Sequence, residues 1–245
     1  MEKAQKGMRD WWKLLEKRGD WDVKPIRPEL VAKNLGEVLA DDAIISTDSG
    51  TITTWIAREL KIRRGQMFSL SGNLATMAPG LPYAIAAKVA FPHRQSVAFV
   101  GDGGFTMLMG DFVTAVKYKL PICVVVIKNN VLGQIKWEQM IFLGYPEYGV
   151  DLQPIDFAKY AEACGGVGFH VEDPDQVRPM LEKALQSDRP ALVEVVTDPV
   201  EPPMPAKVRW EQAKDFALAM ARGEPNRTRI GLTLFRDVLH DTFAR

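Results

Sequence analysis

An acidic residue inside a glycine-rich turn is the first feature of this sequence that could do chemistry. Asp102 lies in Gly101-Asp102-Gly103-Gly104, directly after the apolar run of residues 96–100. Glycine permits positive φ angles and lets a ligand approach the backbone closely. A carboxylate repels bare phosphate, so a phosphate site centred on Asp102 requires a bridging cation. Mg²⁺ fits, because it takes oxygen ligands from a few protein groups and from phosphate and water.

A second oxygen ligand is expected from Asn129, which follows the next apolar run, residues 121–127. The separation from Asp102, 129 − 102 = 27 residues, leaves room for one helix and one strand. A βαβ crossover of this kind brings both loops to the same edge of a parallel sheet. The amide oxygen of Asn is a neutral hard ligand, and a backbone carbonyl of the following turn could supply a third. The spacing therefore predicts a divalent-cation site.

The elements that must position these residues are predicted from hydrophobic patterning. The run at residues 121–127 has no polar alternation, which is typical of a strand buried on both faces of a parallel sheet. We predict an α/β fold, a doubly wound, mostly parallel six-stranded sheet with helices on both faces. Ligands bind beyond the carboxyl ends of such strands, where Asp48, Asp102 and Asn129 are expected. The predicted strands are residues 42–47, 66–70, 96–100, 121–127, 167–171 and 191–196.

Charged and proline-rich stretches divide the chain into three predicted parts. Residues 1–27 are a charged helix and linker, residues 28–198 the α/β domain, and residues 199–245 a helical tail. A linker with Pro199, Pro202, Pro203 and Pro205 opens the tail, which we expect to pack on the domain or dock a partner chain rather than lie on a membrane surface. The predicted helices are residues 52–60, 75–89, 105–118, 135–142, 154–164, 174–186, 210–222 and 229–245.

The composition argues against several classes of protein. Lys+Arg and Asp+Glu both count 31, so the basic excess of a nucleic-acid binder is lacking. Cys123 and Cys164 are far apart, which indicates neither a disulfide framework nor a zinc site. The charged N-terminus does not resemble a signal peptide, and no apolar run approaches the ~20 residues of a spanning helix. We expect a cytoplasmic protein.

The segment from Gly101 to Gln134 resembles the signature of thiamine-diphosphate enzymes, a GDG turn followed one helix and one strand later by Asn-Asn. The resemblance runs from about Pro28 to Pro199 and is to the C-terminal diphosphate-binding domain of pyruvate oxidase (quinone-linked pyruvate dehydrogenase) and acetolactate synthase. It implies thiamine diphosphate and Mg²⁺ as cofactors. FAD would enter only through domains not present in this chain.

The same resemblance assigns roles to individual residues. Mg²⁺ would be held by Asp102, Asn129 and the carbonyl of Val131. Met77 would hold the cofactor in its bent, reactive shape, and the carbonyl of Ala75 would face its aminopyrimidine. The residues expected to bind the cofactor are Ser49, Gly50, Thr51, Ala75, Thr76, Met77, Asp102, Gly103, Gly104, Asn129, Val131, Leu132, Gly133 and Gln134.

The resemblance also places substrate-facing side chains after the second Asn. Gln134, Ile135 and Glu138 occupy these positions, and together with Met77 we expect Gln134 and Glu138 to act in catalysis. Glu at position 138 favours a resemblance to oxidase-like members of the family, which tend to have Glu there, whereas acetolactate synthases tend to have Trp. Lys128 is a departure, since it occupies the first Asn of the family's usual pair while the ligand position, Asn129, is kept.

The implied reaction is decarboxylation of a small 2-keto acid, with pyruvate as first choice and acetolactate synthase-type carboligation as the alternative. In the family, a Glu from a separate pyrimidine-binding domain activates the cofactor across a dimer interface. We therefore expect a homo- or hetero-oligomer with such a domain. An excised C-terminal piece, one subunit of a split enzyme and a noncatalytic cofactor-binding module all stay open. An unrelated nucleotide-binding α/β domain is the remaining rival.

Overall fold

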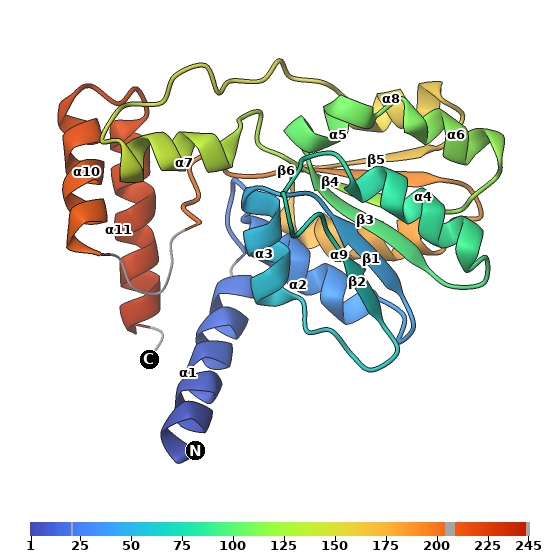
Figure 1. Ribbon diagram of the computed structural model, residues 1–245, viewed down its shortest axis with the longest axis horizontal. Helices are drawn as coiled ribbons and strands as arrows, with labels where there is room; N and C mark the ends of the chain where they lie inside the picture. Colours follow the sequence, from blue (N-terminus) through green and yellow to red (C-terminus); the bar gives the residue numbers. More distant parts are fainter. Residues whose placement is uncertain (21, 204–208, 244–245) are drawn as a thin grey trace. The chain divides into compact units, whose positions relative to one another are not determined.

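The computed structural model of this chain describes residues 1–20, 22–203 and 209–243, with side chains up to residue 237 (Figure 1). Pro205 of the predicted linker and the last two residues of the predicted tail helix lie outside the described residues. The chain divides into two units, Met1–Asn129 with Pro154–Asp198, and Asn130–Gln153 with Pro199–Arg245. The boundaries predicted after residues 27 and 198 stay a prediction.

The first unit contains a six-stranded sheet in the order β2-β1-β3-β4-β6-β5, and every neighbouring pair of strands is parallel. All six predicted strands are present, and the doubly wound α/β class is confirmed. Apolar residues fill β3 and β4 because these central strands are covered on both faces. The strands are β1 (Ile44–Thr47), β2 (Met67–Ser69), β3 (Ser96–Gly101), β4 (Cys123–Lys128), β5 (Val167–Val171) and β6 (Ala191–Val196).

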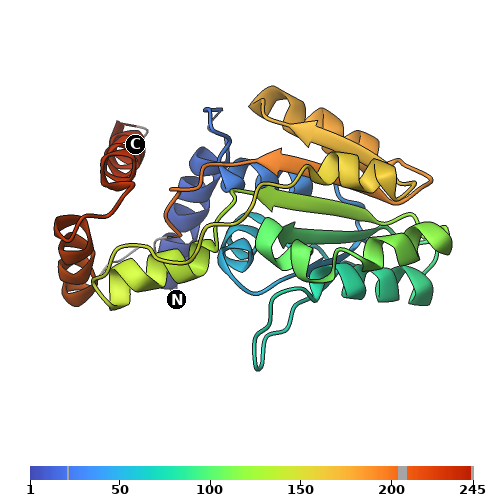
Figure 2. The same cartoon turned by 90° about the horizontal axis from the view of Figure 1, so that it is seen from above.

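Helices cover the two faces of the sheet and form two separate hydrophobic cores (Figures 1 and 2). One core lies under α2 (Pro28–Val38), α3 (Thr51–Glu59) and α9 (Pro174–Leu185). The other lies under α4, α5, α6 and α8. From β1 the chain goes to β2 on one side, and from β2 it returns past β1 to β3 on the other side. The direction of strand addition therefore reverses between β1 and β3, which flank a topological switch point. The helices of the second face are α4 (Gly80–Ala90), α5 (Asp102–Leu108), α6 (Asp111–Lys117) and α8 (Phe157–Ala163).

Three helix predictions are corrected by the structure. Helix α2 was not expected, because prolines around residue 28 indicated a linker, yet Pro28 occupies the first turn of the helix, where its missing N–H costs nothing. The helix predicted at residues 75–89 begins only at Gly80, since Ala75 and Ala78 have φ angles of 55° and 80°. These left-handed residues override the helix propensity of alanine.

The helix predicted at residues 105–118 is two helices, α5 and α6, which are separated at Met109 and Gly110. The hydroxyl of Tyr160 donates a hydrogen bond to the carbonyl of Met109 at 2.6 Å, so this carbonyl has a partner from another element. Glycine at position 110 further weakens helix continuation. Residue patterning alone did not indicate the break, because both halves carry apolar residues at helical spacing.

The second unit is helical and has its own small core, in which Trp137 stacks on Phe216 with ring centroids 6.4 Å apart. Its helices are α7 (Gly133–Phe142), α10 (Trp210–Ala221) and α11 (Arg227–Phe243). The predicted tail helices are thus present over the described residues. Helix α1 (Glu2–Gly19) belongs to the first unit. Within the described part of the chain, every helix is too short or too polar to cross a membrane.

Candidate active site

Three loops of the first unit meet at the carboxyl edge of the sheet because they follow three neighbouring parallel strands. β1 ends at Thr47, β3 at Gly101 and β4 at Lys128, in the spatial order β1-β3-β4. Thr47 pairs with Phe99, and Gly101 pairs with Ile127, so the strand ends are nearly level. The predicted site residues of this unit come from these loops and from the segment before α4.

Asp102 and Asn129, the two predicted side-chain ligands of Mg²⁺, are adjacent in the structure. Oδ2 of Asp102 accepts a hydrogen bond from the backbone N–H of Asn129 at 3.0 Å, and Oδ1 accepts one from Gly103 at 2.9 Å. The side chain is only 4% exposed, while Asn129 is half-buried. The βαβ crossover has therefore brought together residues far apart in the sequence, as the spacing predicted.

The turn after β1 is tied to the loop before α4. The backbone N–H of Ser49 donates to the carbonyl of Thr76 at 3.1 Å, and the Ser49 hydroxyl donates to Ser71 at 3.3 Å. Gly50 has a φ of 129°, and a Cβ atom there would meet nothing within 4 Å. Thr51 then begins α3. A ligand can thus approach the backbone at Gly50.

The segment that carries Ala75, Thr76 and Met77 is an exposed loop rather than the start of a helix. Ala75 and Thr76 are exposed, and Met77 is half-buried. The hydroxyl of Thr76 donates to the carbonyl of Met77 at 3.0 Å. A left-handed residue on each side of Thr76–Met77 gives this loop a defined turn, so the side chain of Met77 is presented by backbone geometry.

Asp48, which was expected at the carboxyl ends of the strands but was given no role of its own, is a buried acid. It is 1% exposed, and its Oδ1 accepts a hydrogen bond from the backbone N–H of Gly80 at 2.8 Å. Burial raises the pKa of Asp48 to about 6, and hydrogen bonds from the backbone of Gly80 and Ala78 partly oppose this rise. The signal in the sequence was its position directly after a strand, the same signal that identified Asp102.

The remaining predicted residues belong to the second unit. Val131 pairs with Asp151 in an isolated antiparallel bridge, and the N–H of Leu132 donates to Val150 at 2.8 Å. Gly133 opens α7, where Nε2 of Gln134 donates to Oε1 of Glu138 at 2.7 Å. Of the three predicted substrate-facing side chains, Gln134 and Glu138 thus contact each other, and Ile135 is exposed. Their position relative to Asp102, and the carbonyl of Val131 as a third ligand, stay a prediction.

Lys128, the departure from the family pattern, has a structural partner. Its Nζ lies 2.5 Å from Oε1 of Glu194 on the neighbouring strand, and both side chains are buried. Oε2 of Glu194 accepts the backbone N–H of Ala158 at 3.0 Å. The lysine is therefore held by an internal ion pair that joins β4 to β6.

The donor set at the strand ends suits Mg²⁺ and a diphosphate. Mg²⁺ needs only one or two protein carboxylates when phosphate and water complete its shell, and Asp102 is such a carboxylate. The described residues contain no cluster of three or more His, Cys, Asp or Glu that could hold a metal, so an all-protein cage is not what this site offers. Open space at Gly50 and Gly101 leaves room for a ligand against the backbone.

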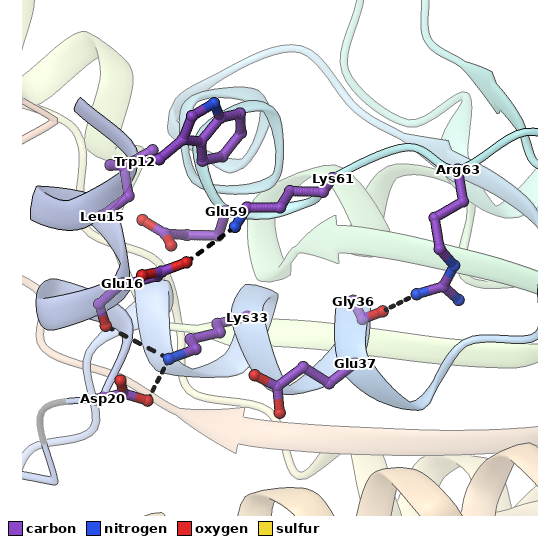
Figure 3. Close-up of a pocket in the computed structure, with 10 residues that line it drawn as sticks. All are labelled: Trp12, Leu15, Glu16, Asp20, Lys33, Gly36, Glu37, Glu59, Lys61 and Arg63. Carbon is purple, nitrogen blue, oxygen red and sulfur yellow. Dashed lines mark hydrogen bonds and ion pairs between the residues drawn. The ribbon is translucent and has the colours of Figure 1, made fainter. Parts of the chain in front are cut away.

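A cavity of about 440 Å³ lies elsewhere in the first unit, between α1, α2 and the end of α3 (Figure 3). None of the predicted site residues lines it. Its cations already have partners: Lys33 pairs with Asp20, and Lys61 pairs with Glu16 at 3.1 Å. Glu59 is buried at its wall, and burial raises the pKa of this carboxyl to about 8.

Comparisons with known proteins agree with this geometry. Residues 48–195 match the family described as thiamine pyrophosphate enzyme, C-terminal TPP binding domain. The chain is 45% identical over 215 residues, 88% of its length, to YdaP of Bacillus subtilis (strain 168), whose name describes it as thiamine pyrophosphate-containing. It is 33% identical over 212 residues to pyruvate oxidase of Lactiplantibacillus plantarum, and 31% over 213 residues to the large subunit of acetolactate synthase isozyme 3 of Escherichia coli (strain K12).

The match covers 86% of this chain for the pyruvate oxidase and 82% for the acetolactate synthase subunit. It covers much less of the relatives themselves: 37% of YdaP, 35% of the pyruvate oxidase and 37% of the acetolactate synthase subunit. The chain therefore spans about a third of the length of the curated relatives it matches.

Proposed function

The chain belongs to the thiamine pyrophosphate (thiamine diphosphate) enzymes, as their C-terminal TPP-binding domain, and from this we propose that it binds thiamine diphosphate with Mg²⁺ for the decarboxylation of a 2-keto acid. Pyruvate is the first candidate substrate, because one of the similar proteins is named a pyruvate oxidase.

The observation that carries this proposal is the contact between Asp102 and Asn129. Two oxygen-bearing side chains lie at the ends of adjacent strands, 27 residues apart by 129 − 102, and the carboxylate of one accepts the backbone N–H of the other at 3.0 Å. A carboxylate fixed in this way has lone pairs left for a cation. A magnesium ion between Asp102, Asn129 and the diphosphate would neutralise the repulsion between carboxylate and phosphate.

The residues of the first unit would divide the work of holding the cofactor. Backbone groups of Gly103, Gly104 and the Ser49–Thr51 turn would contact the diphosphate, since glycine allows the close approach that phosphate binding needs. Met77 and the carbonyl of Ala75 would orient the cofactor's rings. The bound cofactor would supply the nucleophilic carbon and the electron sink, so the protein's task is orientation and electrostatics.

Gln134 and Glu138 are proposed to face the keto acid. Their hydrogen bond of 2.7 Å fixes the amide and the carboxylate relative to each other on α7. Such a pair can present one hydrogen-bond donor and one acceptor to a substrate carboxylate or carbonyl.

A carboligase reaction is the second candidate, because the chain is about as similar to an acetolactate synthase, at 31%, as to a pyruvate oxidase, at 33%. Product analysis with pyruvate separates the two: decarboxylation gives acetaldehyde, or acetate when an electron acceptor is supplied, whereas carboligation joins two pyruvate molecules to give acetolactate, and both release carbon dioxide.

Calorimetric titration of thiamine diphosphate into the purified chain tests the proposed function. Saturable binding in Mg²⁺ that is lost in EDTA is expected, with no binding of ATP or NAD⁺ at the same concentrations. Thiamine without its diphosphate is the matched ligand control and should bind far more weakly, because the cation bridge needs phosphate. Equal binding in EDTA, or a preference for ATP or NAD⁺, would contradict the proposal.

A further inference from the structure

Asp48 occupies a central place in the sheet. It follows β1 directly, and β1 lies between β2 and β3 at the switch point of the sheet. The side chain is 1% exposed, so it faces protein rather than water. A buried carboxylate is costly unless the protein gains something specific from it.

The carboxylate of Asp48 is bound to the loop that presents Met77. Oδ1 accepts the backbone N–H of Gly80, the first residue of α4, at 2.8 Å. This N–H is one of the helix-start donors that have no partner within the helix. Ala78, two residues earlier, is held at a φ of 80°, a strained conformation for alanine that surrounding contacts must maintain.

The same carboxylate is wedged against the glycine turn. A Cβ atom at position 104 would overlap Oδ2 of Asp48 and lie 2.9 Å from its Cγ. A Cβ atom at position 80 would lie 3.0 Å from Oδ1 and would overlap Val100. Both glycines are therefore matched to Asp48, and the carboxylate fixes the spacing between the α4 loop and the GDGG turn.

We propose that Asp48 is a positioning residue, which holds the Ala75–Pro79 loop against the Gly101–Gly104 turn so that the ring-orienting and diphosphate-binding parts of the site keep one geometry. The inference rests on the proposed function for its consequence in cofactor binding. The interlock itself concerns the protein without cofactor, and it can be measured there.

The first test is hydrogen exchange on the cofactor-free chain. Asp48→Ala removes the acceptor of the Gly80 N–H, and the exchange of that amide is expected to accelerate by at least about tenfold, the loss of one buried hydrogen bond. Asp48→Asn keeps an acceptor oxygen at the same place and should restore protection to within about threefold of wild type. Asp188→Ala, an exposed acid in the same unit, is the control and should change nothing. Unchanged exchange in Asp48→Ala would overturn the proposal.

The second test is a double-mutant cycle with Gly104→Ala, read by thermal unfolding of the cofactor-free chain. In the wild-type background the new methyl group collides with Asp48, so we expect a lower Tm. In the Asp48→Ala background the collision is gone, and Gly104→Ala should cost little further. If Asp48→Ala does not fold, Asp48→Ser replaces it, because it is also too short to collide. Equal damage in both backgrounds would overturn the interlock.

The two tests separate the inference from the proposed function. If the wild-type chain binds no thiamine diphosphate, the proposed function fails, while hydrogen exchange and thermal unfolding still decide whether Asp48 interlocks the two segments. If the wild type binds and Asp48→Ala binds with unchanged affinity, the positioning role fails and the proposed function stands.

Discussion

At the scale of single residues, the site depends on a few charged groups whose surroundings decide what they can do. Asp102 and Asp48 both follow strands and are both buried, yet they contact different partners. Asp102 accepts the backbone N–H groups of Asn129 and Gly103, and we propose that it also binds a cation. Asp48 accepts the backbone N–H of Gly80 and lies against position 104, and we propose that it holds a loop. The residue type alone therefore did not separate a ligand from a scaffold.

Lys128 gives the first prediction at this scale. Glu194→Gln leaves the buried ammonium of Lys128 without its anion, so the free energy of unfolding should fall by about 3 kcal/mol. Glu182→Gln, which breaks an exposed pair with Arg178, is the control and should cost no more than about 0.5 kcal/mol. Urea denaturation of both variants measures the difference. A loss of the same size in both would contradict a special role for the buried pair.

Glu59 gives a prediction on pH. Burial raises its pKa from 4.5 to about 8, so the folded chain retains a proton that the unfolded chain releases. The stability that this group contributes is complete below pH 4.5 and is lost as the pH rises toward 8, by a few kcal/mol. Glu59→Gln cannot ionise, so the stability of this variant relative to wild type should increase from pH 5 to pH 8. Urea denaturation across that range is the measurement, and parallel profiles for the two proteins would refute it.

At the scale of elements, the strands could be predicted almost completely, and the loops between them could not. Apolar runs such as residues 121–127 have few alternatives in a parallel sheet. The helix expected at residues 75–89 was wrong at its start, because left-handed residues and a hydrogen bond to Asp48 are tertiary effects. The adjacency of Asp102 and Asn129 followed from spacing and topology. The interlock at Asp48 needed coordinates, since it joins three segments.

The break between α5 and α6 gives a prediction at this scale. Gly110 has helical angles, φ −55° and ψ −27°, and a Cβ atom there would meet nothing within 4 Å. Gly110→Ala should therefore stabilise the protein by about 0.5–1 kcal/mol, because alanine restricts the unfolded chain. Gly168→Ala in β5 is the comparison variant, because its new Cβ atom would overlap the carbonyl oxygen of Ala158. This substitution should lower the free energy of unfolding by about 2 kcal/mol or more. Thermal unfolding of both variants should give Tm shifts of opposite sign. A lower Tm for Gly110→Ala would contradict the helical backbone angles and the open space described at Gly110.

At the scale of the whole molecule, the chain carries about a third of the length of its relatives, and the family assignment rests on residues 48–195. The catalytic proposal therefore includes a partner with a pyrimidine-binding domain and its activating Glu. The purified chain alone is expected to decarboxylate pyruvate no faster than buffer containing Mg²⁺ and thiamine diphosphate.

Adding a pyrimidine-binding domain from a related enzyme should raise the rate, and the same domain with its Glu changed to Gln should not. Carbon dioxide release measures both. Rapid turnover by the chain alone would show that the site is complete without a partner.

The most direct test of the central claim is the affinity for thiamine diphosphate as a function of Mg²⁺ concentration in Asp102→Ala and Asn129→Ala, with Asp188→Ala as control. We expect native circular dichroism for both site variants and a loss of about tenfold to a hundredfold in affinity at fixed Mg²⁺, since each removes a proposed ligand of the cation. The control should bind as wild type does. Unchanged, Mg²⁺-dependent binding in Asp102→Ala would contradict the proposed cation site, because the cation would then be held by other residues.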